Sequence, residues 1–340
     1  MITDCWGQNK SSSFVIHLVV SPWQVMTPNM YSMQLWETSG HAANCKENMF
    51  VFEIEKQEFG LKPINCPGYC SMYGIVELPL RLTDFGVLHR NEASGALTGL
   101  TRVRRFQQDD AHIFCRESQV TSFASYTIHQ RSTLGDIATW DKAEAALTEA
   151  LNEFGKLWQI KEGDYGPKID FSAYDALKRK FQCATLELDF QLPSRLNLSY
   201  SAEDEAKRER PVMIYRAVLG SVERMLAILL EHYKGKWPFW LSPRQAIVCT
   251  VSLKSQPHAL QVQDQIHRAG YYVDVNTTDR MIRKKVREAQ LAQYNYILVV
   301  GEVEANTRQV KMRLRDEEEL SNKSIEDLLT HFKEEVAAFH

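Results

Sequence analysis

The sequence predicts an α+β fold, in which a mostly antiparallel sheet flanked by helices is followed by a smaller α/β unit. Two observations support this prediction. In the first part of the chain, β-rich segments surround one clear amphipathic helical segment. In the last part, segments typical of strands and helices alternate, as they do in α/β domains.

The elements of the first part follow from the spacing of apolar residues. Over Thr139–Phe154 they recur at helical spacing, which predicts an amphipathic helix that covers a sheet. Strands are predicted at Lys168–Phe171 and at Lys180–Phe190, where the pattern largely alternates. The sequence Leu192-Pro193-Ser194 then marks a turn.

A buried helix is predicted within Arg210–Tyr233, a segment that opens on a proline and gathers apolar residues on one helical face. These apolar residues are Val218, Leu219, Val222, Met225, Leu226, Leu229 and Leu230. The next segment, Trp237–Pro243, is too rich in proline for a helix. We therefore expect the junction between two domains there.

Beyond this junction the alternation of elements predicts a separate small domain. The predicted strands are Gln245–Val251, Tyr271–Val275, Tyr296–Val300 and Gln309–Arg315. The predicted helices are Ala259–Ala269, Asp279–Gln293 and Ser324–Phe339. Asp316–Leu320 is predicted to be an acidic turn on the solvated surface.

Composition narrows the class of protein. With 44% apolar and 24% charged residues, the chain is typical of soluble globular proteins. Its net charge of −3 provides no global positive field, so any RNA contact must be local. Seven irregularly spaced cysteines and no secretory leader favour reduced thiols in an intracellular compartment. The apolar run Phe14–Val20 is far too short to span a bilayer, so no membrane partner is expected.

The stretch Leu80–Cys115 is the most informative part of the chain. It places arginines, carboxylates, glutamines, an aromatic residue and a histidine between two β-compatible runs joined by a glycine-containing turn. This composition suits a pocket on a sheet for a nucleotide and a small polar ligand. A surface hairpin with scattered charges is the alternative, which the complete ordered string disfavours.

Leu80–Cys115 resembles motif 2 of the class II aminoacyl-tRNA synthetases, and among them the threonyl-tRNA synthetases of the eukaryotic cytosolic type. The resemblance implies that Arg90 holds the α-phosphate of ATP and the amino acid carboxylate. It also implies that Glu92 reads the adenine amino group and that Phe106 stacks on the base. Arg102 falls on a further arginine position on the ATP side.

Ala217–Arg224 resembles motif 3 of the same class, in which a Gly-Ser pair lets a strand approach the ligand before a helix begins. The resemblance implies that Arg224 meets ATP from the face opposite Arg90. These two arginines are therefore the predicted catalytic residues, which neutralise phosphate charge together with Mg²⁺. A salt-bridged helix arginine is the alternative for Arg224.

The resemblance assigns further residues to the two substrates. The residues for the amino acid are Gln108, Asp110, Tyr165 and Ser221, and the further residues for ATP are Gln182 and Thr185. In this assignment Asp110 pairs with the substrate ammonium, and Gln108 with its carboxylate or the phosphate. Glu187 stands where the family usually has glutamine, which adds a negative charge near an anionic intermediate.

The resemblance also implies a zinc ion, because a hydrophobic pocket cannot strongly reject valine in favour of threonine. Cys66 and His112 match two of the three family ligands. The third position is Tyr215, and a phenol is a poor zinc ligand at neutral pH. The alternative third ligands are Cys70 and Cys115, unless each is simply a small buried residue. Tyr69 stands where the family usually has a further histidine.

The last part of the chain resembles the anticodon-binding domain of several class II synthetases, which implies a mixed sheet and tRNA(Thr) as a partner. A basic cluster on one predicted helix suits phosphate contact, although such a face can also be merely solvated. Its members are Arg280, Arg283, Lys284, Lys285 and Arg287.

The expected domains are a divergent N-terminal segment (1–20), a class II catalytic domain (21–240) and an anticodon-binding domain (241–340). We expect the N-terminal editing domain of the family to be absent and only the end of motif 1 to be present, so that the homodimer usual in the family would lack its interface helix. The expected function is threonine–tRNA ligation in the cytoplasm, or alternatively in mitochondria. The alternatives are an impaired synthetase-like protein that binds tRNA or a synthetase partner, and an enzyme that activates another amino acid.

Overall fold

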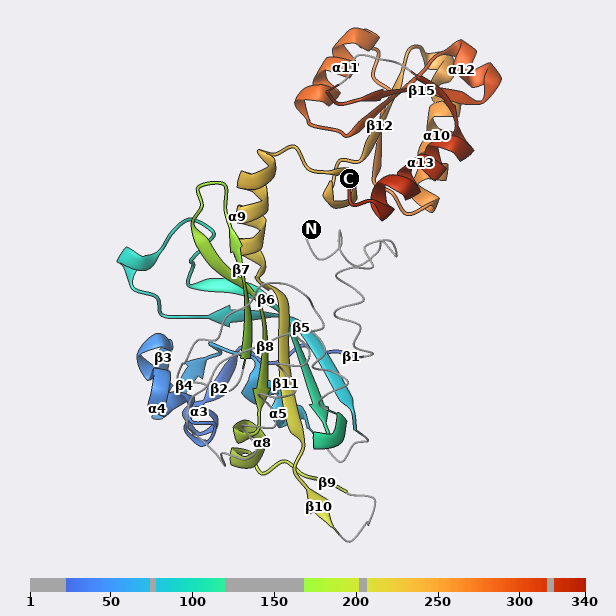
Figure 1. The fold of residues 1–340 in the computed structure, drawn as a ribbon. Coiled ribbons are helices and arrows are strands. Elements are labelled where there is room, and N and C mark those ends of the chain that lie inside the picture. The colour runs from blue at the N-terminus through green and yellow to red at the C-terminus, as the bar shows by residue number, and fades with distance from the viewer. Residues whose placement is uncertain (1–22, 74–77, 120–167, 202–206, 317–320) are drawn as a thin grey trace. The chain divides into compact units, whose positions relative to one another are not determined.

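The chain forms two compact units, which we describe from a computed structural model (Figure 1). The structure describes residues 23–73, 78–119, 168–201, 207–316 and 321–340. The first unit runs to Leu229 and the second begins at Leu230. The predicted boundary at residues 240 and 241 stays a prediction. The predicted helix Thr139–Phe154, the segment 1–20 and Tyr165 lie outside the described residues.

The first unit is built on a six-stranded sheet in the order β1-β5-β6-β11-β8-β7 (Figure 1). The β1–β5 pair is parallel and the other pairs are antiparallel, so the predicted α+β architecture is confirmed. The strands are β1 (Trp23–Gln24), β5 (Leu80–His89), β6 (Arg105–Cys115), β7 (Lys168–Tyr174), β8 (Lys180–Asp189) and β11 (Val212–Ser221).

Smaller elements complete this unit. A three-stranded sheet has the order β2-β4-β3, and β9 pairs with β10. These strands are β2 (Met30–Ser32), β3 (Val51–Ile54), β4 (Gln57–Leu61), β9 (Tyr200–Ser201) and β10 (Arg208–Glu209). The helices are α3 (Met33–Thr38), α4 (His41–Cys45), α5 (Cys66–Met72), α8 (Gln191–Arg195) and α9 (Val222–Tyr233), of which the last continues into the second unit.

Strand register decides which side chains share a face of the main sheet. Because successive side chains on a strand point to opposite faces, Ile113 and Ile214 join one apolar cluster while Phe114 and Met213 join another. The second cluster also contains residues of α5 and α8. One row of paired residues runs across the sheet through Leu82, His112, Tyr215, Glu187 and Lys168. The register therefore brings together three parts of the sequence that are far apart.

Two predictions for this unit are wrong in part. A helix does form within Arg210–Tyr233, but it begins only at Val222, so Val218 and Leu219 lie on β11. This strand is mostly buried on both faces and reads as a continuous apolar run, which periodicity cannot distinguish from a helix. The predicted turn at Leu192–Ser194 is instead the helix α8, whose Gln191 and Leu192 N–H groups donate to Asp189 Oδ1.

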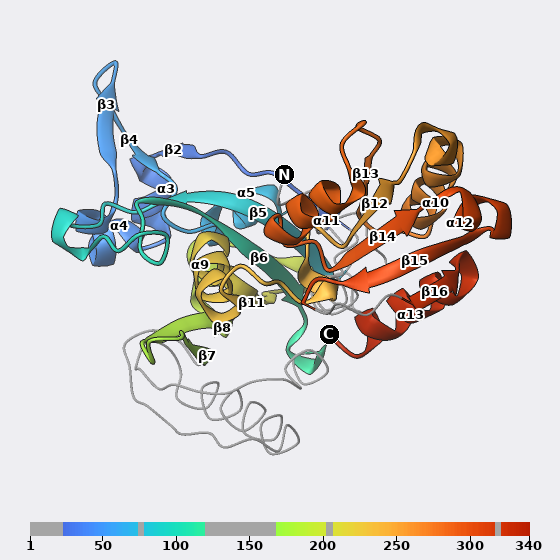
Figure 2. The same cartoon turned by 90° about the horizontal axis from the view of Figure 1, so that it is seen from above.

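The second unit contains a mixed five-stranded sheet in the order β13-β12-β14-β15-β16 (Figure 2). The first two pairs are parallel and the last two antiparallel, which confirms the predicted mixed sheet. The strands are β12 (Ala246–Thr250), β13 (Val273–Asn276), β14 (Tyr296–Val300), β15 (Gln309–Leu314) and β16 (Ser321–Ser324). The helices are α10 (Gln256–Arg268), α11 (Ile282–Leu291), α12 (Glu302–Thr307) and α13 (Ile325–Ala337). The short elements α12 and β16 were not predicted.

The two faces of this sheet bury separate apolar clusters. Val248 and Leu298 pack with residues of α10 and α13, whereas Ile247 and Ile297 pack with residues of α11. The near-continuous apolar runs of β12 and β14 match strands that are covered on both faces.

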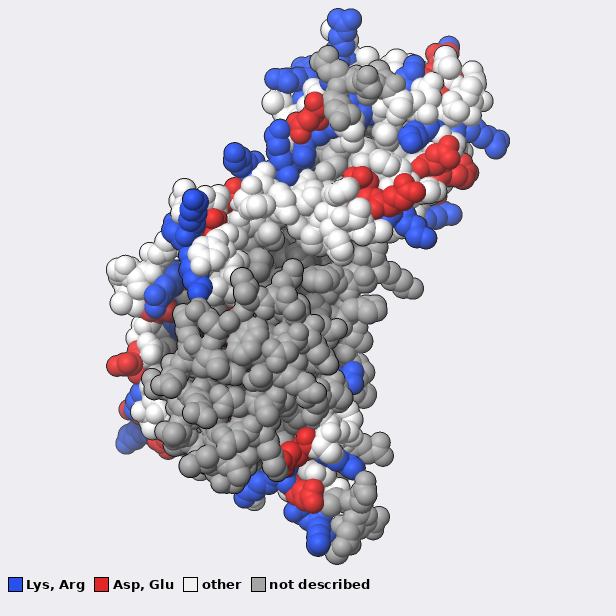
Figure 3. Space-filling view, in the orientation of Figure 1, with Lys and Arg blue, Asp and Glu red and all other residues white. Residues whose placement is uncertain are grey.

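The predicted basic cluster of this unit is only partly correct. Lys285 is 1% exposed, and its ammonium donates to the Thr250 carbonyl (2.7 Å) and hydroxyl (3.0 Å) and to the Asn276 carbonyl (3.4 Å). Arg280 precedes α11 and pairs with Glu288 at 2.8 Å. Arg283, Lys284 and Arg287 remain exposed. On the face shown in Figure 3, basic and acidic side chains are interspersed over the described surface, in line with the small net charge.

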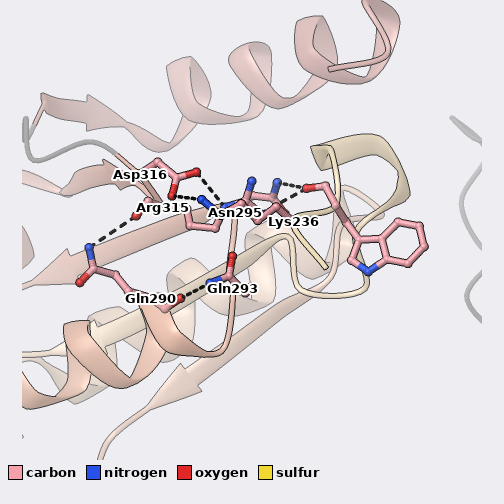
Figure 4. A network of polar contacts seen from close by, with 7 residues as sticks. Lys236, Gln290, Gln293, Asn295, Arg315 and Asp316 are labelled. Atoms are coloured by element: carbon pink, nitrogen blue, oxygen red, sulfur yellow. Dashed lines mark hydrogen bonds and ion pairs between the residues drawn. The ribbon is translucent and has the colours of Figure 1, made fainter. Parts of the chain in front are cut away.

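A polar network attaches the segment that precedes β12 to the sheet of this unit (Figure 4). The Trp237 carbonyl accepts from Asn295 Nδ2 at 2.9 Å and from Arg315 Nη1 at 3.3 Å. Asp316 accepts from Arg315 (3.3 Å) and from Lys236 (2.9 Å). The network thus fixes Lys236 and Trp237 at the ends of β14 and β15.

We expect Asn295→Asp to destabilise the second unit by about 2 kcal/mol, because a carboxylate would face the Trp237 carbonyl in place of a donor. Calorimetric unfolding of the full chain would show the shift in the transition of this unit. The control Asn306→Asp adds the same charge at an exposed position of α12 and should change the transition little. Equal stability of the two variants would contradict this role of Asn295.

Candidate functional site

The β5–β6 hairpin places Glu92 and Arg102 side by side. Arg102 Nε and Nη2 lie 2.9 Å and 2.7 Å from Glu92 Oε2. The Arg104 side chain holds the backbone here by donating to the Glu92 carbonyl at 3.0 Å. Arg102 is about half exposed, so the ion pair contributes little to stability and can exchange for a ligand.

Arg90 is fixed just beyond the end of β5. Its Nε donates to the Pro63 carbonyl at 3.2 Å, and its guanidinium carbon lies 5.1 Å from the centre of the Phe106 ring. A cation over an aromatic face is attracted by the ring quadrupole. The structure therefore brings together two residues that the sequence predicted for the nucleotide.

Arg224 reaches the same region from the first turn of α9. Its Nε donates to the Thr101 carbonyl (2.8 Å) and its Nη1 to the Gln182 carbonyl (3.0 Å). Burial lowers the pKa of the Arg224 guanidinium, Cys183 opposes this, and the charges of Arg90 and Arg102 lower the pKa further. Arg90 and Arg102, from the β5–β6 hairpin, are therefore within electrostatic reach of Arg224, which is distant in sequence. A polyanion would stabilise this arrangement.

The start of α9 is held by two carboxylates that were not predicted. Asp109 accepts from the N–H groups of Val218 (2.9 Å), Leu219 (2.8 Å) and Gly220 (2.9 Å), while the Glu223 carboxylate accepts from the Gln107 N–H. Burial raises the pKa of Asp109 to about 6 although these N–H groups oppose it. Both carboxylates act on the backbone, and no spacing in the sequence signals such contacts.

At Gly220 the backbone of β11 lies close to the backbone of β8. Its φ is +68°, a left-handed conformation that favours glycine, and a Cβ there would lie 2.4 Å from the Cys183 carbonyl oxygen. The close neighbour of Gly220 is thus the backbone of β8, and the predicted approach of the Gly-Ser pair to the ligand stays a prediction. Ser221 Oγ accepts from the Arg224 N–H at 3.2 Å.

Gln182 and Thr185 both contact Asp170, a residue that was not predicted for the site. Gln182 Nε2 donates to Asp170 Oδ1 at 2.6 Å and Thr185 Oγ1 donates to the same atom at 2.8 Å. Lys168 lies 3.1 Å from Asp170 Oδ2. Burial raises the pKa of Glu187, Lys168 lowers it, and Asp170 and Asp189 raise it. This edge of the site therefore carries more acidic than basic groups.

Asp110 is the centre of a buried polar corner. It is fully buried, and its two oxygens accept from Tyr215 Oη (2.8 Å) and Asn65 Nδ2. Gln108 Nε2 donates in turn to Tyr215 Oη. Burial raises the pKa of Asp110 to about 7, and the hydrogen bonds from Asn65 and Tyr215 oppose this. A carboxylate in such surroundings is stabilised by a cationic partner such as an ammonium group.

Lys62 and Asn65 were also not predicted. Lys62 is fully buried and donates to Thr27 Oγ1 at 2.7 Å. Burial lowers the pKa of Lys62, while Asp84 and Asp110 raise it. This lysine thus balances part of the charge of the two buried carboxylates. Asn65 immediately precedes α5, and its carbonyl accepts from the N–H groups of Gly68 and Tyr69.

Among the described residues, the predicted zinc ligands Cys66 and His112 do not join a third histidine, cysteine or carboxylate. His112 is fully buried, its ring stacks on Tyr69 at 4.2 Å, and the Tyr215 ring meets it at 61° with centres 5.0 Å apart. Burial lowers the pKa of His112 to about 3 and raises the pKa of the Cys66 thiol well above its usual value. Within the part of the chain that the structure describes, no three His, Cys, Asp or Glu side chains stand close enough to hold a metal ion.

The alternative third ligands do not complete the set. Cys115 belongs to the apolar cluster on the face of β6 opposite His112, because one strand alternates its side chains. Cys70 lies on the correct face, but its thiol contacts Met213 Sδ at 3.8 Å. Tyr215 uses its hydroxyl for Asp110 and Gln108. The donor set therefore does not fit a zinc ion with three protein ligands.

The sheet and its gathered arginines define the class of protein. Residues 50–233 match the family model described as the tRNA synthetase class II core domain (G, H, P, S and T), and residues 245–335 match the anticodon binding domain. No helix among the described residues is long and apolar enough to cross a membrane.

Relatives define the family within this class. The threonine–tRNA ligase, mitochondrial 1, of Arabidopsis thaliana is 64% identical over 93% of this chain and 48% of its own length. The cytoplasmic threonine–tRNA ligase of Saccharomyces cerevisiae is 51% identical over 91% of this chain and 47% of its own length. A crystal structure of the RNA binding domain of threonyl-tRNA synthetase from Cryptosporidium parvum Iowa II is 47% identical and covers 92% of this chain and 85% of its own, with a TM-score of 0.79.

The chain belongs to the threonyl-tRNA synthetase family of the class II aminoacyl-tRNA synthetases. The predicted family is therefore confirmed. The chain spans about half the length of the curated relatives it matches.

Proposed function

We propose that this chain activates threonine with ATP, forming threonyl-adenylate and pyrophosphate, and transfers the threonyl group to the 3′-terminal adenosine of tRNA(Thr). The observation that carries the proposal is the approach of Arg90, which follows β5, and Arg102, in the β5–β6 connection, to Arg224 at the start of α9. Three cations that repel one another in the free protein gain a favourable partner when a triphosphate binds.

Activation needs no side-chain nucleophile, because the carboxylate of the amino acid attacks the α-phosphorus itself. We assign the α-phosphate to Arg90 and the opposite side of the triphosphate to Arg224. Phe106 would stack on the adenine, and Glu92 would leave its pair with Arg102 to accept from the adenine amino group. Mg²⁺ would neutralise further phosphate charge when bound.

The amino acid would lie at the buried corner around Asp110. The carboxylate of Asp110 would bind the substrate ammonium, and Gln108 the substrate carboxylate or phosphate. Ser221, Gln182, Thr185 and Tyr165 keep the roles predicted for them, and Tyr165 lies outside the described residues. Asp109 and Glu223 hold the backbone that carries Ser221 and Arg224.

A second candidate is a synthetase-like protein of impaired activity that binds tRNA or a synthetase partner. Tyr215 favours it, because this residue stands where the family has a zinc ligand, and so does Glu187, which adds a carboxylate at the acidic edge of the site. An enzyme that activates another amino acid, serine in particular, is a third candidate. We further propose a cytoplasmic location, with mitochondria as the alternative.

Pyrophosphate exchange into ATP tests these candidates. We expect folded protein to catalyse exchange that depends on threonine, with weaker signals from serine and from valine, because a pocket without zinc cannot strongly reject valine. If protein shown by circular dichroism to be folded gives no exchange with any of the three amino acids, activation of these amino acids is excluded. If that protein still binds tRNA, the second candidate is favoured. Exchange that is faster with serine would favour the third.

A further inference from the structure

The hydroxyl of Tyr215 is already fully engaged in the structure. It donates to Asp110 Oδ1 at 2.8 Å and accepts from Gln108 Nε2, and the residue is only 4% exposed. A phenol binds a metal through a deprotonated oxygen. Binding a metal here would therefore remove the proton that Asp110 accepts and leave a fully buried carboxylate short of one donor.

The neighbours of Tyr215 do not offer an alternative set of ligands. His112 meets the Tyr215 ring at its edge and stacks on Tyr69, while Cys66 lies in the same apolar cluster as Tyr215. Cys115 lies on the opposite face of the sheet. Cys66 and His112 alone provide two ligands, one fewer than the three protein ligands usual even in catalytic zinc sites.

We propose that the corner formed by Cys66, His112 and Tyr215 is metal-free in this protein, and that Tyr215 acts there as a positioning residue for the Asp110 carboxylate. Tyr215 and Asn65 hold one carboxylate oxygen each, so the carboxylate keeps one orientation relative to the sheet. This inference rests on the proposed function only in taking Asp110 as the group that binds the substrate ammonium.

The direct test is the zinc content of the purified full chain. Wild type, Tyr215→His and Tyr200→His are expressed with added zinc, dialysed against a weak chelator and measured by elemental mass spectrometry. Tyr200→His is the matched control, because Tyr200 is also buried but hydrogen-bonds to Glu209 at the β9–β10 hairpin. We expect zinc content in Tyr215→His to exceed that of wild type and of the control by at least about tenfold.

Two results would overturn the proposal. Wild-type protein with about one zinc per chain that is lost in Cys66→Ser would show that the metal site exists. A Tyr215→His protein that is folded and as free of zinc as wild type would show that Tyr215 is not the residue that prevents zinc binding.

A second variant tests the positioning role, and it keeps the proposal testable if Tyr215→His does not fold. Tyr215→Phe removes only the hydroxyl, so it should raise the KM for threonine by roughly tenfold, with little change in the KM for ATP and no zinc uptake. Equal KM values for threonine in wild type and Tyr215→Phe would overturn this role. Zinc content is independent of turnover, so failure of the proposed activity would leave the metal result intact.

Discussion

Replacing Arg224 with alanine should lower the rate of threonine-dependent pyrophosphate exchange by roughly 10²–10³-fold, the effect expected when a fixed donor to developing phosphate charge is removed. Arg224 is held by the carbonyls of Thr101 and Gln182, so its guanidinium is already positioned before the ligand arrives. Arg90→Ala should cause a loss of similar size, since the Pro63 carbonyl and the Phe106 ring hold the Arg90 guanidinium in place in the same way.

The measurement is the initial exchange rate at saturating threonine across a range of ATP concentrations. Arg208→Ala is the control, because Arg208 is an exposed arginine on β10. Arg224→Lys keeps the charge but loses the planar group that reaches two carbonyls, and should recover only part of the rate. Exchange at the wild-type rate in Arg224→Ala would remove the basis of the proposed function.

Gly220→Ala should destabilise the first unit by about 3 kcal/mol or more, because two independent penalties act at this position. The left-handed φ of +68° is unfavourable for alanine, and the added Cβ would lie 2.4 Å from the Cys183 carbonyl oxygen. That contact is with the backbone of β8, so no side chain can move aside to relieve it.

Gly99→Ala separates the two penalties. Gly99 also has a positive φ, of +47°, but nothing lies within 4 Å of the point that an alanine Cβ would occupy, so only the conformational penalty of about 1–2 kcal/mol applies. Calorimetric unfolding of both variants would show the difference. A Gly220→Ala protein as stable as Gly99→Ala would mean that β8 and β11 are not in close contact at this point.

The sequence predicted the elements whose pattern is local. The strands of the β5–β6 hairpin and the alternation of β12, α10, β13, α11 and β14 were all predictable, because periodicity reports which face of an element is buried. The helix start at Val222 was not, since the preceding strand is buried on both faces and has no alternation.

For the site, the sequence predicted the residues of two motifs but not the residues that hold them in place. Asp109 accepts from the backbone of β11, Asn65 donates to the carboxylate of Asp110, and Lys62 donates to the hydroxyl of Thr27. Each of these partners is distant in sequence. A carboxylate or an amide that binds such distant partners looks like any surface residue in a sequence. Only the fold shows that it is buried.

The sequence by itself determined the family, the order of the main elements and the arginines that we propose for the triphosphate. The tertiary structure alone decided which side chains meet across the sheet: that Tyr215 binds Asp110 instead of completing a set of metal ligands, that Cys115 lies on the face away from His112, and that Lys285 is buried. The physical reason is strand register and burial, because pairing between distant strands sets both the neighbours of a side chain and its access to water.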